Sequence, residues 1–530
     1  MTGAVIDAGQ APDTPREGPI STRDWIAVAA GILGAFMAVL DIAITNSSLP
    51  QIQGEIGATG TEGTWISTAY LVAETIMIPL SAWMVRLFGL GRFVFVCAAL
   101  FTVFSVICGY AQSLPQMIFG RLGQGFFGGA LIPTAMTIIA LKLPPSKLAL
   151  GMTLFGTTVV MAPVLGPVLG GFLTDNAGWY WVFFINIPVG LLLLTMIQFG
   201  FDTEPFNWDE LRRGDWLGIG GLSLFLGTLT VVLEEGHRDQ WFESAFIVKL
   251  TIACIFGLGL FLIAQKLSKD PVLKLNLLRN RNFSGSLIIA LLMGGAYFSV
   301  LYVVPIFLGV IAGYNASQIG VVMMYSGAGS LVTVFAYPML AKHVDLRLLV
   351  FAGLILAAIS FHMGSFLASD WGTDQFIWLQ LVLGAAMSLI FFPLSQVALA
   401  GIVSHDVPDA SGFFNMARNL GGSIGLALTA TLIDTRHAFH LQVLAETISA
   451  NGAIAAERLA AISNGLAMRA TDGVDNTQRA LILIQAEIER EALTMSFADY
   501  FTVMMVAAVI VLPSILMLAR AEATDGAMAH

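Results

Sequence analysis

The chain has 530 residues, of which 57% are hydrophobic and only 11% are charged, and its mean hydropathy is +0.81. A typical soluble domain carries roughly 25% charged residues, so this composition excludes a soluble enzyme and a disordered chain. The net charge of −10 provides no basic surface for DNA or RNA, and the composition indicates a polytopic membrane protein.

Fourteen apolar runs are long enough to cross a membrane. A spanning helix needs about 20 apolar residues, because about 30 Å of hydrocarbon is crossed in steps of about 1.5 Å. The runs are continuous rather than alternating, which favours an all-α membrane fold over a β-barrel. They cover residues 25–45, 65–85, 93–110, 117–140, 150–173, 180–200, 215–234, 245–264, 285–309, 319–340, 348–367, 376–401, 412–434 and 498–519.

The basic residues between the runs predict the orientation. If the N-terminus is cytoplasmic, the inside connectors hold sixteen Lys and Arg residues, whereas the short outside connectors hold Arg238, with Lys249 just inside the next run. An excess of positive charge marks the cytoplasmic side, so both termini are expected there. Residues 1–22 are polar and no cleavage site follows the first run, so we expect no cleavable signal peptide.

The outside connector 435–497 is long and rich in Ala, Glu and Arg. Leu481, Ile484, Ile488, Ala492 and Met495 recur at three- and four-residue spacing, which predicts a helix with one apolar stripe. This connector could form a helical hairpin that folds on itself or extends the last two spans. Alternatively, it could be a docking surface for an extracytoplasmic partner.

Four charged residues lie deep inside the runs, at Asp41, Glu74, Arg121 and Arg418, whereas Glu234, Lys249, Asp434 and Asp499 lie near run ends. A charge at mid-membrane costs about 2.5–3.5 kcal/mol on insertion scales, so each one calls for an explanation. A carboxyl group in apolar surroundings can load and release a proton, which makes Asp41 and Glu74, with Arg121 nearby, candidates for proton coupling. They could instead form a buried pair that only fixes helix packing. Asp41 lies in the outer half of its run and could be solvated from outside.

Glycine clusters form a second pattern, at Gly125–Gly129, Gly166–Gly170 and Gly421–Gly425. Small residues at this spacing let helix backbones approach closely. Pro167 lies within the second cluster and should kink its helix, which predicts a rocking interface between two bundles. Close packing alone would explain the glycines equally well.

Aromatic and Met residues of several runs could line a wide apolar substrate pocket, although such side chains also face lipid or core. The candidates are Tyr70, Tyr297, Tyr302, Met324 and Tyr325. No Walker, HExxH, GxSxG or paired metal-ligand motif appears, and Cys97, Cys108 and Cys254 fall in apolar runs. We therefore expect neither an enzyme nor a metal site.

Five stretches together resemble motifs of the major facilitator superfamily, in its fourteen-span drug:proton antiporter branch (the EmrB/QacA type). They are LDIAITNSSLPQI (40–52), FGRLGQGFFGGALIP (119–133), APVLGPVLGGFLTD (162–175), WYWVFFINIPVG (179–190) and FFNMARNLGGSIGLAL (413–428). They resemble the signatures of the first, fourth, fifth, sixth and thirteenth spans, in that order. The resemblance extends from about residue 24 to residue 519.

The resemblance implies a domain organisation with two six-helix bundles related by a pseudo-two-fold axis along the membrane normal. The bundles would be residues 25–200 and 285–519, the second including the outer loop 435–497. Two inserted spans with their linkers would occupy 201–284, and the cytoplasmic tails would be 1–24 and 520–530.

The resemblance also implies drug/proton antiport by alternating access in the inner (plasma) membrane, with the proton gradient as energy source and no cofactor. Asp41 would carry the proton and Arg121 would regulate it, while Gln124 and Gly125 match the fourth-span motif. The fifth-span residues Gly166, Pro167, Gly170 and Gly171 would form a seal against leak. Arg418 is the polar group of the thirteenth-span signature, and a periplasmic adaptor and an outer-membrane channel are implied partners.

The loop AWMVRLFGLGR (82–92) departs from the family pattern, because Ala82 replaces its usual glycine and Arg86 its usual aspartate. The charge relay that this loop normally supplies at the inner face is therefore in doubt. The fifth-span motif also begins with Ala162 instead of glycine.

The leading hypothesis is a proton-driven multidrug efflux antiporter for amphipathic compounds, acting as the inner-membrane pump of a tripartite system. One alternative is a dedicated exporter of a single metabolite, such as a fatty acid, siderophore or antibiotic, which a substrate profile would reveal. The other is a non-transporting receptor or scaffold that recruits partners through 435–497, which the charged groups inside the spans argue against.

Overall fold

The computed structural model describes residues 20–202, 204–447, 453–467 and 476–518, and every regular element in this part of the chain is a helix. The predicted tails 1–24 and 520–530 lie outside it, apart from residues 20–24. The long helices are α1 (Thr22–Ile56), α3 (Trp65–Phe88), α4 (Leu90–Gly109), α5 (Leu114–Lys142), α6 (Pro145–Ala177), α8 (Asn186–Gly200), α10 (Trp216–Glu235), α11 (Ala245–Leu267), α12 (Arg281–Val310), α13 (Ala316–His343), α14 (Leu346–Gly364), α15 (Thr373–Leu399), α16 (Val407–Thr447), α17 (Ala453–Ala467) and α18 (Asn476–Val511). Short helical segments are α2 (Gly60–Gly63), α7 (Trp181–Phe184), α9 (Trp208–Arg213), η1 (Trp241–Glu243), η2 (Leu275–Arg279), η3 (Ser404–Asp406) and η4 (Leu512–Met517).

Thirteen helices of the described chain are long and apolar enough to cross a membrane, which confirms an all-α polytopic fold. The remaining predicted run, 412–434, lies within α16. This helix is less apolar because it carries Asn415, Arg418 and Asn419. The count of fourteen crossings and the side on which the termini lie stay predictions.

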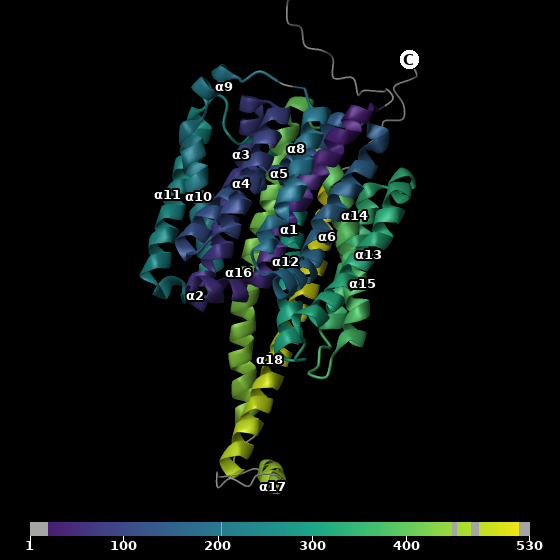
Figure 1. The fold of residues 1–530 in the computed structure, drawn as a ribbon. Coiled ribbons are helices and arrows are strands. Elements are labelled where there is room, and N and C mark those ends of the chain that lie inside the picture. The colour runs from purple at the N-terminus through teal and green to yellow at the C-terminus, as the bar shows by residue number, and fades with distance from the viewer. Residues whose placement is uncertain (1–19, 203, 448–452, 468–475, 519–530) are drawn as a thin grey trace, which may run out of the picture.

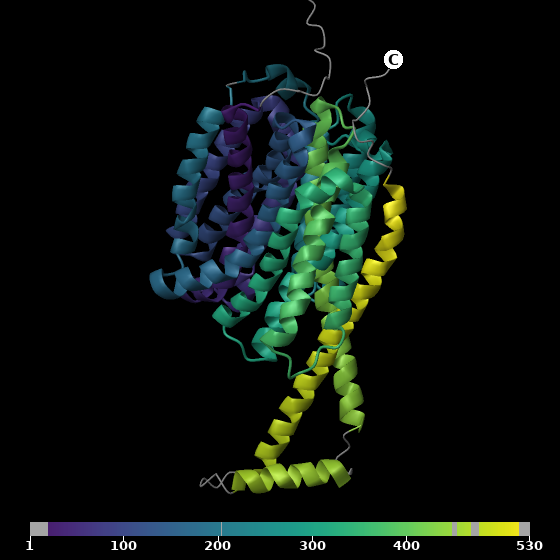
Figure 2. The ribbon, with the colours of Figure 1, turned by 90° about the vertical axis from the view of Figure 1, so that its right-hand side faces the viewer.

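The long helices form two bundles that lie side by side, one purple to blue and the other mainly green (Figure 2). In the first bundle, α1 packs on α5, α6 and α8, and α5 packs on α3 and α4. In the second, α12 packs on α16, α15 packs on α13 and α14, and α18 packs on α14 and α16. The bundles meet where α6 contacts α13 and α15, and where α16 contacts α3 and α5.

Two of the glycine clusters permit very close helix contacts inside the bundles. A Cβ atom added at Gly125 of α5 would lie 2.2 Å from the backbone oxygen of Tyr70 in α3. A Cβ atom at Gly421 of α16 would lie 1.9 Å from the backbone oxygen of Leu291 in α12. Only glycine fits such approaches, so these clusters fix how α3 and α16 are held within their own bundles.

The inserted helices α10 and α11 form a hairpin at the side of the first bundle (Figure 1). A Cβ atom at Gly221 would lie 2.6 Å from the backbone nitrogen of Phe261, so the two helices are in close contact. α10 also contacts α3 of the first bundle and α16 of the second. Only 22% of the most apolar stretch of α11 is buried, so α11 is covered on one side only. Its other side is available to lipid.

The described parts of the segment 435–497 are helical, as predicted. α16 and α18 run on beyond the bundles, and α17 lies across their ends (Figures 1 and 2). We call the described part of this segment the stalk. The described chain begins and ends at the opposite end of the bundles, which we call the terminal end (Figure 1). Of the predicted stripe, Ile484, Ile488 and Ala492 are the more covered residues, whereas Leu481 and Met495 are exposed.

Candidate functional site

Asp41 lies at the centre of a buried polar site in the first bundle. Its Oδ2 atom accepts a hydrogen bond and ion pair from Arg121 of α5. Its Oδ1 atom accepts from Gln124 Nε2 at 3.1 Å and from Asn186 Nδ2 of α8 at 2.6 Å. Ser105 of α4 accepts from the same two amides, at 2.7 and 3.2 Å. Four helices therefore converge on one carboxylate.

Arg121 connects this carboxylate to α3. The Arg121 side chain is completely buried, and its Nε atom donates to the backbone oxygen of Ile66 at 3.2 Å. Its guanidinium lies 4.3 Å from the ring centroid of Tyr70, which permits a cation–π interaction. The Nη2 atom has no hydrogen-bond partner within the described chain. Arg121 is thus held by the charge on Asp41 on one side and by α3 on the other.

The Asp41 side chain is fully buried. From the sequence, Asp41 could have been solvated from outside, but its exposed fraction is 0%. The reason is that α1 has 35 residues, well beyond the predicted run 25–45, so that Asp41 lies near its middle with helices on several sides. A buried carboxylate of this kind is stable only while it is paired or protonated.

The pairing predicted between Asp41 and Arg121 is therefore present, and Gln124 belongs to the same site. Asn186 and Ser105 were missed by the sequence analysis, although Asn186 lies in the quoted stretch 179–190. Neutral polar residues inside apolar runs are common, and the only available signal was that both could hydrogen-bond a buried charge.

Glu74 lies apart from this site, at the boundary between the bundles. It is 1% exposed, and Arg418 and Asn419 of α16 act on its carboxylate, Arg418 by charge and Asn419 by a hydrogen bond. Arg121 acts on it by charge as well. Arg418 is itself 4% exposed, and Gly294 of α12 packs directly against its backbone. The structure thus places the predicted residues Glu74 and Arg418 together, each on a different bundle.

The fifth-span glycines lie inside the first bundle rather than between the bundles. A Cβ atom at Gly166 would lie 2.3 Å from Ala43 Cβ of α1, and one at Gly170 would lie 2.0 Å from Ser47 Oγ. Gly171 has nothing within 4 Å of such an atom, and Pro167 lies inside α6. These glycines therefore form a close contact between α6 and α1, not the rocking interface between the bundles that we predicted. At the boundary between the bundles, Val168 of α6 faces Gly320 of α13.

A family model described as Major Facilitator Superfamily matches residues 31–426 of this chain. The chain belongs to the major facilitator superfamily. Among its relatives are the colistin resistance protein EmrB of Acinetobacter baumannii, at 35% identity over 90% of this chain and 92% of that protein, and the multidrug export protein EmrB of Escherichia coli, at 32% over 79% and 81%. The fatty acid resistance protein FarB of Neisseria gonorrhoeae is 31% identical over 88% of this chain and 92% of that protein.

Solved structures agree on the fold. The proton:xylose symporter XylE has a TM-score of 0.57 at 14% identity, covering 80% of this chain and 91% of that one. The human organic anion transporter MFSD10 has a TM-score of 0.56 at 13% identity, covering 92% of this chain and all of the other. The protein is thus a multi-pass inner-membrane protein of the EmrB-type branch, and a transporter rather than an enzyme.

The aromatic residues predicted to line a pocket do not gather in one place. Tyr70 belongs to the Asp41 site, where its hydroxyl donates to the backbone oxygen of Ala38 at 3.2 Å. Tyr297 lies between the bundles and donates to the backbone oxygen of Val160 of α6 at 3.2 Å. Tyr302 and Met324 are 42% and 46% exposed, and Tyr325 is partly buried. That these residues line one pocket therefore stays a prediction.

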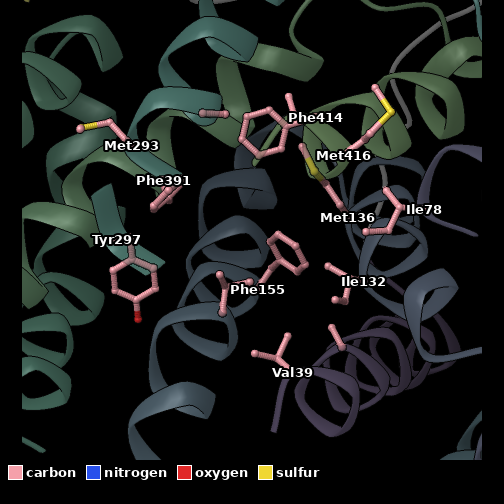
Figure 3. Close-up of a cluster of buried hydrophobic side chains, with 14 of the residues drawn as sticks. Val39, Ile78, Ile132, Met136, Phe155, Met293, Tyr297, Phe391, Phe414 and Met416 are labelled. Carbon is pink, nitrogen blue, oxygen red and sulfur yellow. The ribbon is translucent and has the colours of Figure 1, made fainter. Parts of the chain in front are cut away.

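A different apolar cluster lies where the two bundles of this major facilitator meet (Figure 3). Its side chains come from α1, α3, α5 and α6 of one bundle and from α12, α15 and α16 of the other. They are buried and include three methionines and several aromatic rings. The labelled members are Val39, Ile78, Ile132, Met136, Phe155, Met293, Tyr297, Phe391, Phe414 and Met416. Of these, only Tyr297 was singled out from the sequence, since apolar spans give no signal of which face meets the other bundle.

A charged cluster joins the bundles at the terminal end. Arg86, at the end of α3, donates to Asp409 Oδ2 at 2.7 Å and to Glu210 Oε1 at 3.0 Å. Lys274 Nζ lies 2.5 Å from Asp406 Oδ1 and 3.5 Å from Asp409 Oδ2. Asp409 belongs to the first turn of α16, so the basic residue that replaces the family's usual aspartate makes an ion pair across the bundle boundary. We call these five residues the terminal clamp.

The Asp406 carboxylate of the terminal clamp stays charged near neutral pH. Burial alone would raise the pKa of Asp406, but the hydrogen bond and positive charge of Lys274 outweigh it and hold the pKa below its ordinary value of 3.8. A lowered carboxylate pKa contributes stability above the unfolded-state pKa and loses it as the pH falls through the folded-state value. We therefore expect the Lys274–Asp406 pair of the clamp to stay intact at working pH.

Charge reversal should open the clamp. We expect Arg86→Glu to place three carboxylates together and to increase labelling of a Ser81→Cys reporter from the terminal end by about tenfold, or about 1.4 kcal/mol. Ser81 is 2% exposed and lies on α3 close to Gly412 of α16, so its labelling reports separation of these helices. The double variant Arg86→Glu/Asp409→Arg should restore protection. Equal labelling in all three proteins would contradict the assignment.

Proposed function

We propose that this protein is a proton-driven antiporter that exports amphipathic compounds by alternating access, with Asp41 as the group that exchanges a proton. The observation that carries the proposal is the fully buried Asp41–Arg121 pair with its amide and hydroxyl partners. An intramembrane ionisable pair on several converging helices is the usual setting for a proton relay.

A proton on Asp41 would change the forces inside the first bundle. Once Asp41 is neutral, Arg121 loses its counter-charge, and a buried unpaired charge is costly. Arg121 keeps its hydrogen bond to Gln124 on its own helix at 2.9 Å and its place near the ring of Phe183. Its remaining contacts with α3, at Ile66 and Tyr70, can transmit the change to that helix. Because α3 and α5 both contact α16 of the second bundle, a shift of either helix alters the bundle boundary. Proton binding and bundle movement are thereby coupled.

The energy available is sufficient for export. Each proton entering down one pH unit supplies about 1.4 kcal/mol, and each 100 mV of membrane potential supplies about 2.3 kcal/mol. A tenfold substrate gradient costs about 1.4 kcal/mol. One proton per substrate would therefore sustain at least a tenfold gradient.

The substrates are amphipathic compounds that bind to the apolar cluster between the bundles. Its methionine and aromatic side chains suit ligands of varied shape, because methionine repacks easily and aromatic rings offer large apolar faces. The names of the relatives, which concern colistin, multidrug export and fatty acids, support this class. FarB supports the alternative of a dedicated fatty acid exporter.

Transport in inverted membrane vesicles tests this proposal. A pH gradient, acid inside, is imposed and then followed while cationic, neutral and anionic amphiphiles, including fatty acids, are added. We expect several amphiphiles to dissipate the gradient. Dissipation by fatty acids alone would favour the dedicated exporter, and the absence of any response, together with no substrate uptake, would favour the receptor or scaffold.

We further propose that the terminal end is cytoplasmic and that the stalk docks a periplasmic adaptor leading to an outer-membrane channel. The stalk extends well beyond the bundles, and Leu481, Ile482 and Leu483 near its far end are all more than half exposed. Exposed apolar residues on an extended helix favour burial against another protein.

Removing the stalk separates transport from docking. We expect a deletion of residues 441–492 with a short Gly/Ser linker to keep substrate exchange in vesicles but to abolish efflux from whole cells. The triple variant Leu481→Ser/Ile482→Ser/Leu483→Ser should have the same effect without shortening the stalk. Undiminished efflux from cells that carry either variant would refute the docking proposal.

A further inference from the structure

Two carboxylates from different parts of the chain meet one face of α16. Asn419 hydrogen-bonds Glu74 of α3, and Ser423 Oγ donates to Glu234 Oε1 of α10 at 2.8 Å. Residues 419 and 423 are four positions apart, so they lie on the same helix face, about 6 Å from each other along the axis. Glu234 belongs to the inserted hairpin, which the function proposed above leaves without a role.

The Glu74 carboxylate lacks a hydrogen bond at one of its oxygen atoms on this face. Its Oε1 atom has no hydrogen-bond partner within the described chain, although the residue is 1% exposed. The Nε atom of Arg418, which is 4% exposed, is likewise without a partner there. Buried polar atoms are normally hydrogen-bonded, so such an oxygen indicates a place for a proton or a water molecule.

Glu234 lies on the stalk side of Glu74 and is close to ionisable groups that reach the surface. The carboxylate of its neighbour Glu235 already has partners, since it accepts a hydrogen bond from Thr68 at 2.6 Å and pairs with Arg238 at 2.7 Å. In the connector that follows α10, His237 lies 3.0 Å from Asp434, whose side chain is 71% exposed. Titratable groups thus extend from the exposed end of α10 to the interior of the bundle boundary.

Different charges face the two carboxylates. Glu74 is faced by Arg418 of α16 and Arg121 of α5, with Tyr70 on its own helix. Glu234 is faced by Ser423 of α16 and by the like charge of Glu235 on its own helix. A carboxylate with a like-charged neighbour binds a proton more readily, and one beside guanidinium groups releases it more readily. Glu234 is therefore suited to collect protons and Glu74 to pass them on.

We propose that Glu234 of the inserted hairpin carries protons from the stalk-end surface to Glu74, so that α10 forms the outer part of the proton route. A proton from bulk water binds the Glu234 carboxylate and then moves to the Glu74 carboxylate across the Asn419–Ser423 face, directly or through a water molecule. No bond other than those to the moving proton changes. The inference rests on proton coupling as proposed above, and it assigns the inserted helices a part in that coupling.

The test compares Glu234→Gln with its neighbour variant Glu235→Gln in the full-length protein reconstituted in liposomes. The probe is an amphiphile that wild type exchanges for protons, and the rate of exchange is measured over a series of pH values on the stalk side. We expect Glu234→Gln to slow proton-coupled exchange roughly tenfold or more and to flatten its pH profile. Affinity for the amphiphile and exchange of labelled for unlabelled amphiphile, which need no net proton movement, should stay unchanged.

The result becomes decisive with two further variants and with the behaviour of Glu235→Gln. Glu234→Asp should restore exchange, and Ser423→Ala should shift the pH profile without abolishing exchange. Glu235→Gln removes the like charge beside Glu234 and a partner of α3, so it should weaken the contact of α10 with α3 and move the profile to lower pH without flattening it. A wild-type rate and profile in Glu234→Gln would overturn the inference, as would a loss of amphiphile affinity that matches the loss of exchange. If wild type exchanges no protons, the proposed function fails instead.

Discussion

Asp41→Asn is expected to reach the membrane but to lose uphill export completely, and it should be less stable than wild type because Arg121 keeps a buried charge without its partner. Asparagine preserves the shape of the side chain and can still hydrogen-bond Gln124 and Asn186, whereas it cannot bind or release a proton. The measurement is substrate accumulation in inverted vesicles that carry an imposed pH gradient. We expect an accumulation ratio of about tenfold per pH unit in wild type and about one in the variant.

A matched control tests whether the loss of export is specific to the position of Asp41 or follows from changing any aspartate. Asp175→Asn changes an aspartate of the fifth-span motif that is exposed at the end of α6. It should accumulate substrate like wild type. Downhill exchange by Asp41→Asn should persist, because the substrate still reaches the bundle boundary. If Asp41→Asn accumulates substrate against a gradient, Asp41 is not the coupling group.

Arg121→Gln should have the largest effect on stability. It leaves Asp41 buried beside neutral groups, and breaking a buried pair by removing one partner costs about 3–5 kcal/mol. The orphaned carboxylate would be tolerated only when it is protonated, so the folded variant binds more protons than its unfolded chain. Its stability should therefore fall as the pH rises. Thermal unfolding of the purified protein at acid and alkaline pH measures this.

The double variant Asp41→Asn/Arg121→Gln provides the control. With both charges removed, most of the lost stability should return and the added pH dependence should disappear, while proton-coupled export stays absent. The two single effects should therefore be strongly non-additive, as expected for groups in direct contact. Additive effects would mean that Asp41 and Arg121 do not depend on each other.

The charged residues of the site could be predicted from the sequence, because a charge is unfavourable in the membrane. Asp41, Arg121, Glu74 and Arg418 each place a charge in an apolar run, and the structure brings them together in two groups. Charges in hydrocarbon are costly, so they must find partners. A charged residue within an apolar run can therefore be recognised from the sequence alone. The helix over residues 481–495 followed in the same way from the spacing of its apolar residues.

The orientation of each helix could not be predicted. In a membrane, both the lipid-facing side and the packed side of a helix are apolar, so the pattern that marks a buried face in water is weak. Gly166 was thus assigned to the bundle boundary although it packs on α1. The partner of Arg86 could not be predicted from the sequence either, since Asp409 lies 323 residues away along the chain.

The most direct test of the account is a balance of gradients in liposomes that contain the purified protein, with the membrane potential held at zero. A known pH gradient is set against a series of substrate gradients, and the ratio at which net substrate flux stops is measured. The account predicts that this ratio is about tenfold for each pH unit and each proton exchanged, and that it moves with the imposed pH gradient. A ratio that stays at one at every pH gradient would show that substrate and protons are not exchanged, and would contradict the account.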